Sequence, residues 1–341
     1  AAAGAADGAA KELVAHRLEL ASLRAPSWCG VCGTFLWGLQ EQGQRCAVCP
    51  ALVCAACSPS LAAERCPVFE TPKGADILTN EAIAWQRAAE AKGRPAGDAL
   101  AALAEARRIR ERTGTLETLD GAKLLKNLGL CRSRLRDAAG ALEVYREARD
   151  LYERAGALES ASGAGLLRSI GASLEEVGDA GGAAEAYGAA RGTLERCGAL
   201  ASDEGEGLLK SLGVAREARG DRAGALEAFT EAAQLRRSRG TLQTPSGARL
   251  LASVVAAQGA AGDAAGAEEA FEEAGVIHER LGSMGSADYA RLLQALGAAR
   301  AACAGDVDVR CPGAAGPGGD WEEAFAEARR VLEARGELAT A

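Results

Sequence analysis

Eight candidate metal ligands stand within the first 66 residues of the chain. His16 is followed by seven cysteines, six of which form three successive Cys-x2-Cys pairs. In order, the ligands are His16, Cys29, Cys32, Cys46, Cys49, Cys54, Cys57 and Cys66. Zinc is held by thiolate sulfur and imidazole nitrogen in sets of four, so eight such ligands at paired spacing predict two tetrahedral zinc sites.

A disulfide framework is the alternative for these cysteines. It requires an oxidising compartment and gives no reason for three successive pairs of the same spacing, so the pattern favours zinc. A module of about 50 residues has little core, and structural zinc contributes on the order of 10 kcal/mol to folding. We therefore expect two structural Zn²⁺ ions without an open coordination position, in a reducing compartment such as the cytoplasm or an organelle stroma or matrix.

The residues between the ligands resemble a known family. The segment from Pro26 to Cys49, PSWCGVCGTFLWGLQEQGQRCAVC, is similar to the zinc finger of protein kinase C and its relatives, the diacylglycerol and phorbol-ester-binding module. This resemblance covers about residues 16–66 and implies a cross-braced finger with interleaved ligand sets. One set is His16, Cys46, Cys49 and Cys66, and the other is Cys29, Cys32, Cys54 and Cys57.

The same resemblance implies an apolar tip that could contact lipid, made of Pro26, Leu36, Trp37, Gly38, Leu39 and Gln42. The chain departs from the family at Cys54, where the family has histidine. It also departs in the spacer between the last two cysteines of the module, Cys57 and Cys66, which has eight residues rather than seven. Two interpretations stay open: a structural or protein-binding finger, or one that touches diacylglycerol in a membrane. A FYVE-type finger is disfavoured, because EQGQ replaces its basic stretch and Phe69 stands where its eighth cysteine would fall.

The rest of the chain repeats one pattern every 42 residues, in copies that begin at Asp120, Ser162, Glu204, Ser246 and Asp288. A more divergent copy begins at Leu78. Each copy has two segments with apolar residues at helical period, separated by a Gly-Asp or Arg-Asp pair. The first residue of that pair ends a helix and the aspartate caps the next one, which predicts two antiparallel helices joined by a tight turn. Few β-branched runs occur, so a propeller is excluded.

The spacing of the core residues resembles the tetratricopeptide repeat, with the period of the 42-residue variety found in kinesin light chains. The residues that carry the resemblance in one copy are Leu125, Leu128, Gly129, Ala141, Tyr145 and Ala148. It implies an all-α solenoid of helical hairpins, a tetratricopeptide-like superhelix. A hairpin cannot bury its apolar stripe alone, so the copies must stack on one another.

These patterns divide the chain into four parts. Residues 1–15 form a low-complexity segment and residues 16–66 the double-zinc finger. Residues 67–77 are expected to be a linker, and residues 78–340 six helical repeats. The last repeat contains an insert at about residues 305–319, rich in glycine and proline, near Cys303 and Cys311.

Six cations occupy two neighbouring slots on the first helix of the repeats, three residues apart and therefore on one helical face. They are Lys123, Lys126, Arg168, Lys210, Arg249 and Arg291. This strip is either a surface for an acidic peptide of a protein partner or larger complex, or an ordinary solvated face.

Composition excludes several functions. A net charge of −8 and a pI near 5.2 argue against a nucleic-acid binder. No apolar run reaches 18 residues, so we expect no membrane span, with peripheral membrane contact left open. No nucleophile, base and orienting acid can be grouped, and His278 stands alone. The sequence predicts a non-catalytic adaptor that binds a protein partner; the alternative is a peripheral membrane protein recruited by diacylglycerol.

Overall fold

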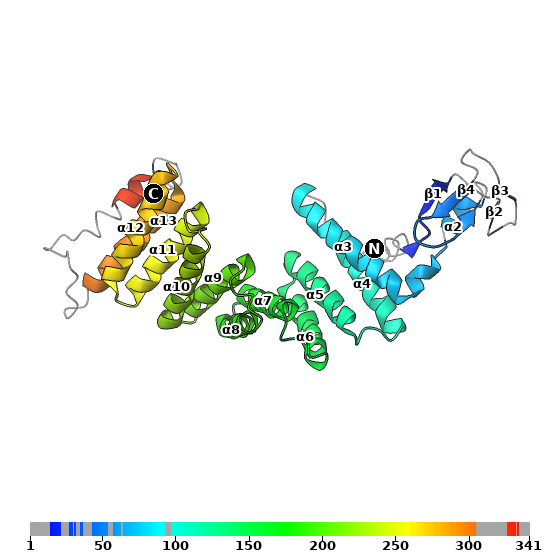
Figure 1. Cartoon of the computed structure of the whole chain (residues 1–341), viewed down its shortest axis with the longest axis horizontal. Helices are drawn as coiled ribbons and strands as arrows, with labels where there is room; N and C mark the ends of the chain where they lie inside the picture. Colours follow the sequence, from blue (N-terminus) through cyan, green and yellow to red (C-terminus); the bar gives the residue numbers. More distant parts are fainter. Residues whose placement is uncertain are drawn as a thin grey trace. The chain divides into compact units, whose positions relative to one another are not determined.

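The computed structural model describes residues 14–21, 27–29, 31, 35–36, 43–53, 57–62, 64–92, 97–304, 326–331 and 333 (Figure 1). The chain divides into two compact units, Ala1–Leu158 and Glu159–Ala341. The insert expected at 305–319, with Cys311, lies outside the described residues, as does most of the segment 1–15.

The first unit begins with small antiparallel sheets. In the larger sheet the strand order is β1 (Leu18–Ala21), β4 (Gly43–Cys46) and β5 (Leu52–Val53). Its register places Leu18 opposite Cys46 and Arg45 opposite Leu52. A separate pair consists of β2 (Ser27–Trp28) and β3 (Phe35–Leu36), and a short helix, α2, spans Ser58–Ala62. The described part of the finger has only a small core, which is centred on Cys29 and Leu61.

Residues 67–77, expected to form a linker, are helical instead. A 3-10 helix, η1, spans Pro67–Glu70, and α3 runs from Pro72 to Lys92. Proline is suited to the first turn of a helix, where its missing N–H is not needed. Gly74 packs so closely on η1 that an added Cβ would lie 2.5 Å from the Cα of Phe69, and Phe69 is fully buried. The finger is therefore followed directly by the first helical hairpin, whose second helix is α4 (Gly97–Arg112).

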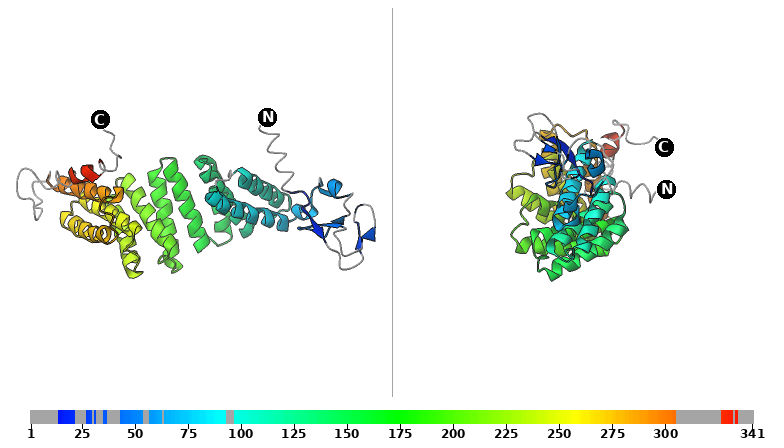
Figure 2. Two further views of the ribbon diagram at one scale, coloured as in Figure 1. Left: turned by 90° about the horizontal axis from the view of Figure 1, so that it is seen from above. Right: turned by 90° about the vertical axis from the view of Figure 1, so that its right-hand side faces the viewer.

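The remaining helices form antiparallel hairpins that lie side by side within each unit (Figures 1 and 2). The first unit contains α5 (Leu119–Arg134) and α6 (Ala138–Arg154). The second contains α7 (Ala161–Glu176), α8 (Ala180–Arg196), α9 (Asp203–Ala218), α10 (Arg222–Ser238), α11 (Pro245–Ala260), α12 (Ala264–Arg280) and α13 (Ala287–Ala304). Residues 326–331 and 333 are also helical.

Side-chain caps recur in the repeats at the ends of the helices. The first helices are capped by Thr118, Ser160, Ser202 and Thr244, and the second helices by Asp137, Asp179, Asp221 and Asp263. Each accepts a hydrogen bond from the backbone N–H three residues later, which satisfies a free amide of the first turn. The predicted Asp caps are confirmed. Gly178, Gly220 and Gly262 precede three of them with φ between 82° and 85°, whereas Arg136 adopts a φ of 65° in the fourth turn.

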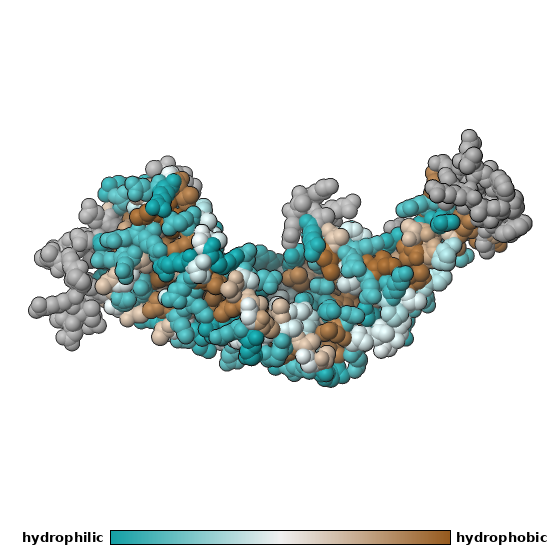
Figure 3. Space-filling view, in the orientation of Figure 1, coloured by the Kyte–Doolittle hydropathy of each residue, from teal (hydrophilic) through white to brown (hydrophobic). Residues whose placement is uncertain are grey.

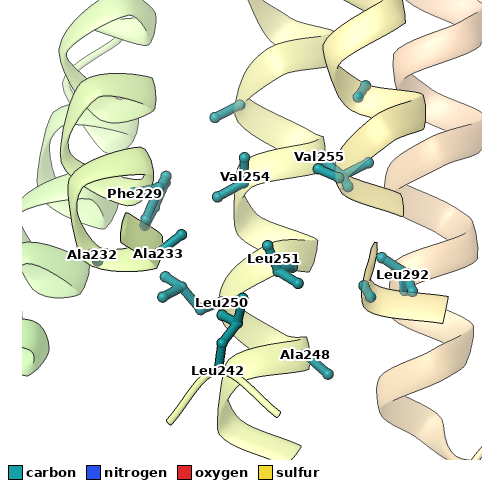
Figure 4. Close-up of a cluster of buried hydrophobic side chains, with 14 of the residues drawn as sticks. Phe229, Ala232, Ala233, Leu242, Ala248, Leu250, Leu251, Val254, Val255 and Leu292 are labelled. Carbon is teal, nitrogen blue, oxygen red and sulfur yellow. The ribbon is translucent and has the colours of Figure 1, made fainter. Parts of the chain in front are cut away.

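In the hairpins α5–α6, α7–α8 and α9–α10, a glycine of the first helix meets an aromatic ring of the second. An added Cβ at Gly129, Gly171 or Gly213 would lie 2.4 Å, 2.7 Å or 2.5 Å from the ring of Tyr145, Tyr187 or Phe229, respectively. Neighbouring hairpins then share a core of small and branched aliphatic residues. Figure 4 shows this around Phe229 and Ala233 of α10 and Val254 of α11, all of which are buried. The predicted fold, an all-α helical-hairpin repeat with a small N-terminal finger, is confirmed.

Candidate metal centre and binding surface

Four of the expected ligands meet in the finger. The ligand atoms of His16, Cys46, Cys49 and Cys66 all lie within 4.8 Å of one another, and Cys49 Sγ is 3.4 Å from His16 Nδ1. A tetrahedral zinc site with Zn–S bonds of about 2.3 Å spaces its ligand atoms roughly 3.5–3.8 Å apart, so the donors suit zinc in type and separation. Within the described ranges this is the one group of histidine, cysteine and acidic residues close enough to hold a metal.

Backbone pairing brings these ligands together from distant parts of the finger. Cys46 ends β4, and its N–H donates to Ala51 O at 2.9 Å, which closes the turn that presents Cys49. Cys66 N–H donates to Val14 O at 2.8 Å, and His16 N–H donates to Glu64 O at 3.3 Å. His16 and Cys66 therefore lie on paired segments, although 50 residues separate them in the chain.

The electrostatic environments of Cys46 and Cys66 also suit a bound cation. Burial alone would raise the pKa of the Cys46 thiol, but hydrogen bonds from the backbone N–H groups of Cys49 and Val48 and from His16 lower it to about 6. Burial raises the pKa of Cys66 to about 12, and the nearby sulfurs of Cys49 and Cys46 act in the same direction. A cluster of three thiolates is opposed by mutual repulsion, which a divalent cation would relieve.

The second expected ligand set is described only in part. Cys29 is buried and Cys57 is half-buried, and both belong to a small cluster with Leu18, Leu52 and Leu61. Cys32 and Cys54 lie outside the described residues. None of the seven cysteines whose side chains the structure describes forms a disulfide, so the disulfide alternative finds no support there.

Comparisons with known proteins agree with these observations. The sequence profile of the phorbol esters/diacylglycerol binding domain, or C1 domain, matches residues 16–67. No curated protein matches the chain. A crystal structure of nearly identical TPR-like repeats, from a putative kinesin light chain of Podosopora anserina, aligns with a TM-score of 0.52 and 13% identity. The alignment covers 65% of this chain and 99% of that one, and a point variant of the same protein gives the same score.

The chain joins a C1-like finger to tetratricopeptide-like repeats. BtubC (BKLC) from P. vanneervenii aligns over 81% of this chain and 95% of its own, with 19% identity and a TM-score of 0.48. At sequence identities this low, the comparison concerns only the fold of the repeats. The resemblance to the C1 domain and the resemblance to the 42-residue repeats are both confirmed.

The expected lipid-facing tip of the C1-like finger falls mostly outside the described residues. This applies to Pro26, Trp37, Gly38, Leu39 and Gln42; only the backbone of Leu36, in β3, is described. In the part of the chain that the structure describes, every helix is too short or too polar to span a lipid bilayer.

The sequence analysis missed the contacts that join the finger to the first hairpin. Arg17, next to His16, pairs with Glu81 of α3, with Nη2 2.8 Å from Oε2, and its guanidinium lies 5.4 Å from the centre of the Phe69 ring. Arg65, next to Cys66, pairs with Glu105 of α4, whose side chain is 6% exposed. The sequence does place an arginine next to the first candidate ligand, His16, and next to the last, Cys66. It does not indicate which carboxylate each arginine pairs with.

The structure separates the six expected surface cations into different environments. Lys123 pairs with Asp120 at 3.1 Å, and Lys126 is half-buried. Arg249 and Arg291 share Asp288, at 3.1 Å and 2.7 Å. Arg168 of α7 and Lys210 of α9 are exposed and make no ion pair with a described carboxylate, and these two helices are in contact.

The visible surface of the second unit is mostly hydrophilic, with scattered hydrophobic residues (Figure 3). His278 does not face solvent: it is 2% exposed, its Nδ1 lies 2.9 Å from Ser283 Oγ, and its ring meets Tyr289 edge to face. Burial lowers the pKa of His278, while Asp288 opposes that shift. This histidine is a packed residue of the last hairpins, as its isolation in the sequence suggested.

Proposed function

We propose that this protein is a non-catalytic adaptor. It binds an acidic segment of a protein partner along the exposed first helices of its repeats, and its C1-like finger, holding two structural zinc ions, serves as a structural or docking module. The observation that carries the proposal is the pair of neighbouring cations Arg168 and Lys210, which lack carboxylate partners among the described residues. A negatively charged segment crossing α7 and α9 would form charge-assisted hydrogen bonds with both.

The test uses the full chain and a fluorescent peptide rich in aspartate and glutamate. Binding measured by fluorescence anisotropy is expected to weaken as salt rises, because the contact is electrostatic. The double variant Arg168→Glu, Lys210→Glu should abolish it. Arg222→Glu with Arg280→Glu, which makes the same charge change on second helices, is the matched control and should bind as the parent does. Binding that is independent of salt or unaffected by the first pair contradicts the proposal.

Zinc content tests the finger. His16, Cys46, Cys49 and Cys66 would hold one ion, and Cys29 and Cys57 would contribute with Cys32 and Cys54 to the other. Zinc in these sites supplies folding energy rather than chemistry. Elemental analysis of the purified chain is expected to give about two zinc ions per molecule, and Cys49→Ser should lose one of them. A parent value near one ion would contradict the second site.

A second candidate function is recruitment to membranes that contain diacylglycerol. It is supported by the match of residues 16–67 to the C1 domain and by the residues Trp37 and Leu39 that the sequence places at the tip. Sedimentation with liposomes, with and without diacylglycerol, tests it. Diacylglycerol-dependent binding that Trp37→Ala abolishes would favour recruitment, and absence of binding to any liposome would exclude it.

A further inference from the structure

A cavity of about 410 Å³ opens between α10 and α12, the second helices of two successive hairpins. Arg237 of α10, Gln258 of α11 and Glu269 and Glu273 of α12 supply most of its polar lining. Ala233 and Val254 line its apolar part, and Figure 4 shows them on the facing sides of α10 and α11.

Other repeats show which kind of side chain can occupy the space of this cavity. The position of Gln258 is occupied by Arg132, Arg216 and Arg300 in three other copies and by Leu174 in the fourth. Arg216 Nη1 donates to Gly224 O at 2.8 Å and to Glu227 Oε2 at 3.0 Å. In the first unit Arg132 Nη1 donates to the corresponding Gly140 O at 3.0 Å. A guanidinium group of the chain itself therefore occupies this position in both of these copies.

At a second position beside the cavity, this repeat has an alanine where other repeats have an arginine. Arg107 and Arg191 reach from one second helix to the next, where they pair with Glu147 at 3.0 Å and Glu231 at 2.8 Å. The corresponding residues around the cavity are Ala233 and Glu273. Glu273 is met instead by Arg237, which comes from the following turn of α10. The cavity is the volume left by alanine and glutamine where other copies have arginines.

The two acceptors that bind Arg216 in its own hairpin have counterparts around the cavity. Gly266 and Glu269 stand where Gly224 and Glu227 bind Arg216, and Glu269 makes no ion pair with any described residue. Gln258 Oε1 is buried and has no hydrogen-bond partner among the described residues. Its Nε2 lies over Gly266, as Arg216 Cδ lies over Gly224. A buried acceptor without a donor is unfavourable, so the site calls for a group rich in donors.

We propose that the cavity between α10 and α12 binds an arginine side chain of a protein partner. A guanidinium group presents five donors in a plane, which matches the amide oxygen of Gln258, the carboxylate of Glu269 and the carbonyl of Gly266. Arg237 pairs with Glu273 and also interacts electrostatically with Glu269, but Glu269 makes no ion pair with a described residue and supplies the charge that attracts a cation. This site is formed by α10, α11 and α12 and does not depend on the acidic-segment surface of α7 and α9.

The direct test is a titration of the isotope-labelled full chain followed by NMR. The probe is N-acetyl-L-argininamide, and N-acetyl-L-citrullinamide is its uncharged isostere. Saturable shifts are expected at the Gln258 side-chain amide and at the Gly266 and Glu269 amides, with affinity for the arginine probe about tenfold higher than for the citrulline probe. Equal affinity for both probes, or no shift at these groups, overturns the proposal.

Variants distinguish this site from nonspecific attraction to an acidic protein. Gln258→Arg fills the cavity from within, so it should abolish the probe shifts and raise the thermal unfolding temperature. Gln234→Arg adds the same charge at an exposed position of α10 and should change neither. Glu269→Gln, which leaves the core untouched, should weaken binding about tenfold and tests the site independently if Gln258→Arg misfolds. Arg168→Glu with Lys210→Glu should leave the titration unchanged, so this proposal and the acidic-segment proposal fail separately.

Discussion

At the residue scale, the most demanding positions are the glycines at which the two helices of a hairpin cross. Gly213 of α9 faces the ring of Phe229, which is 1% exposed, and no space remains between them for a methyl group. Gly207 lies on the same helix with nothing within 4 Å of an added Cβ. We therefore expect that glycine-to-alanine substitutions at these two positions of one helix will change the free energy of unfolding in opposite directions.

We expect Gly213→Ala to lower the free energy of unfolding by about 1–3 kcal/mol, because a buried ring must move to admit the methyl group. Gly207→Ala should raise it by about 0.5–1 kcal/mol, because alanine restricts the unfolded chain more than glycine does. Urea denaturation followed by circular dichroism measures both. Equal effects of the two substitutions would show that the crossing is looser than the structure has it.

His278 predicts a pH dependence of stability at the same scale. Burial lowers its pKa in the folded chain, so the unfolded chain, with an ordinary histidine pKa of about 6.5, binds a proton more readily. Stability is then full above about pH 7 and decreases as the pH falls through about 6.5. His278→Gln should flatten that decrease in denaturation experiments between pH 7 and pH 5. The other histidine of the chain, His16, is the same in the parent and in this variant. An unchanged slope would contradict the assignment.

At the element scale, the finger and the first hairpin are joined by ion pairs that start from residues adjacent to candidate metal ligands. Arg17 holds α3 through Glu81, and Arg65 holds α4 through Glu105. Glu105 is 6% exposed and also pairs with Arg108 and Arg112 of its own helix, so Arg65 adds a cation from the finger to a buried carboxylate that needs compensation. The finger thus contacts the first hairpin, which is the terminal repeat and therefore the one whose outer face has no neighbouring repeat to cover it.

Metal removal should therefore loosen the first hairpin as well as the finger. Hydrogen exchange measured by mass spectrometry before and after treatment with a zinc chelator is expected to show faster exchange in α3 and α4. Exchange in α11 and α12 serves as the internal control and should not change. Glu81→Gln, which keeps the ligands, should reproduce a smaller part of the effect in α3. Unchanged exchange in α3 after metal loss would mean that the finger and hairpin are independent.

At the scale of the whole molecule, contacts run between successive hairpins within each unit, so stability should spread over short distances only. Gly129→Ala, which forces a methyl group against Tyr145, should speed hydrogen exchange in α5 and α6 and, to a lesser degree, in α4. Exchange in α11 to α13 should keep its rate. A uniform increase across all helices would instead indicate one cooperative unit.

The repeats were predictable because their determinants are local. Asp179 caps a helix that begins at the next residue, and Gly178 ends the preceding one, so both signals stand within the turn that they form. The same holds for the 42-residue period, which places the first helices at Leu119, Ala161, Asp203, Pro245 and Ala287. The segment expected as a linker is largely helical, because Pro72 and Gly74, which often mark loops, here serve the first turn of α3 and a close contact with η1.

The sequence by itself determined the helical hairpins, their period and the eight candidate ligands, because propensity, caps and paired spacing act between residues close in the chain. Only the tertiary structure decided which ligands meet, since His16 and Cys66 come together through backbone pairing across the finger. It also decided which of the described cations keep an uncompensated charge, because Asp288 takes up Arg249 and Arg291 but leaves Arg168 and Lys210. The cavity beside Gln258 was also visible only in the tertiary structure. The sequence shows that glutamine replaces arginine there, but only the fold brings acceptors from neighbouring helices around that position.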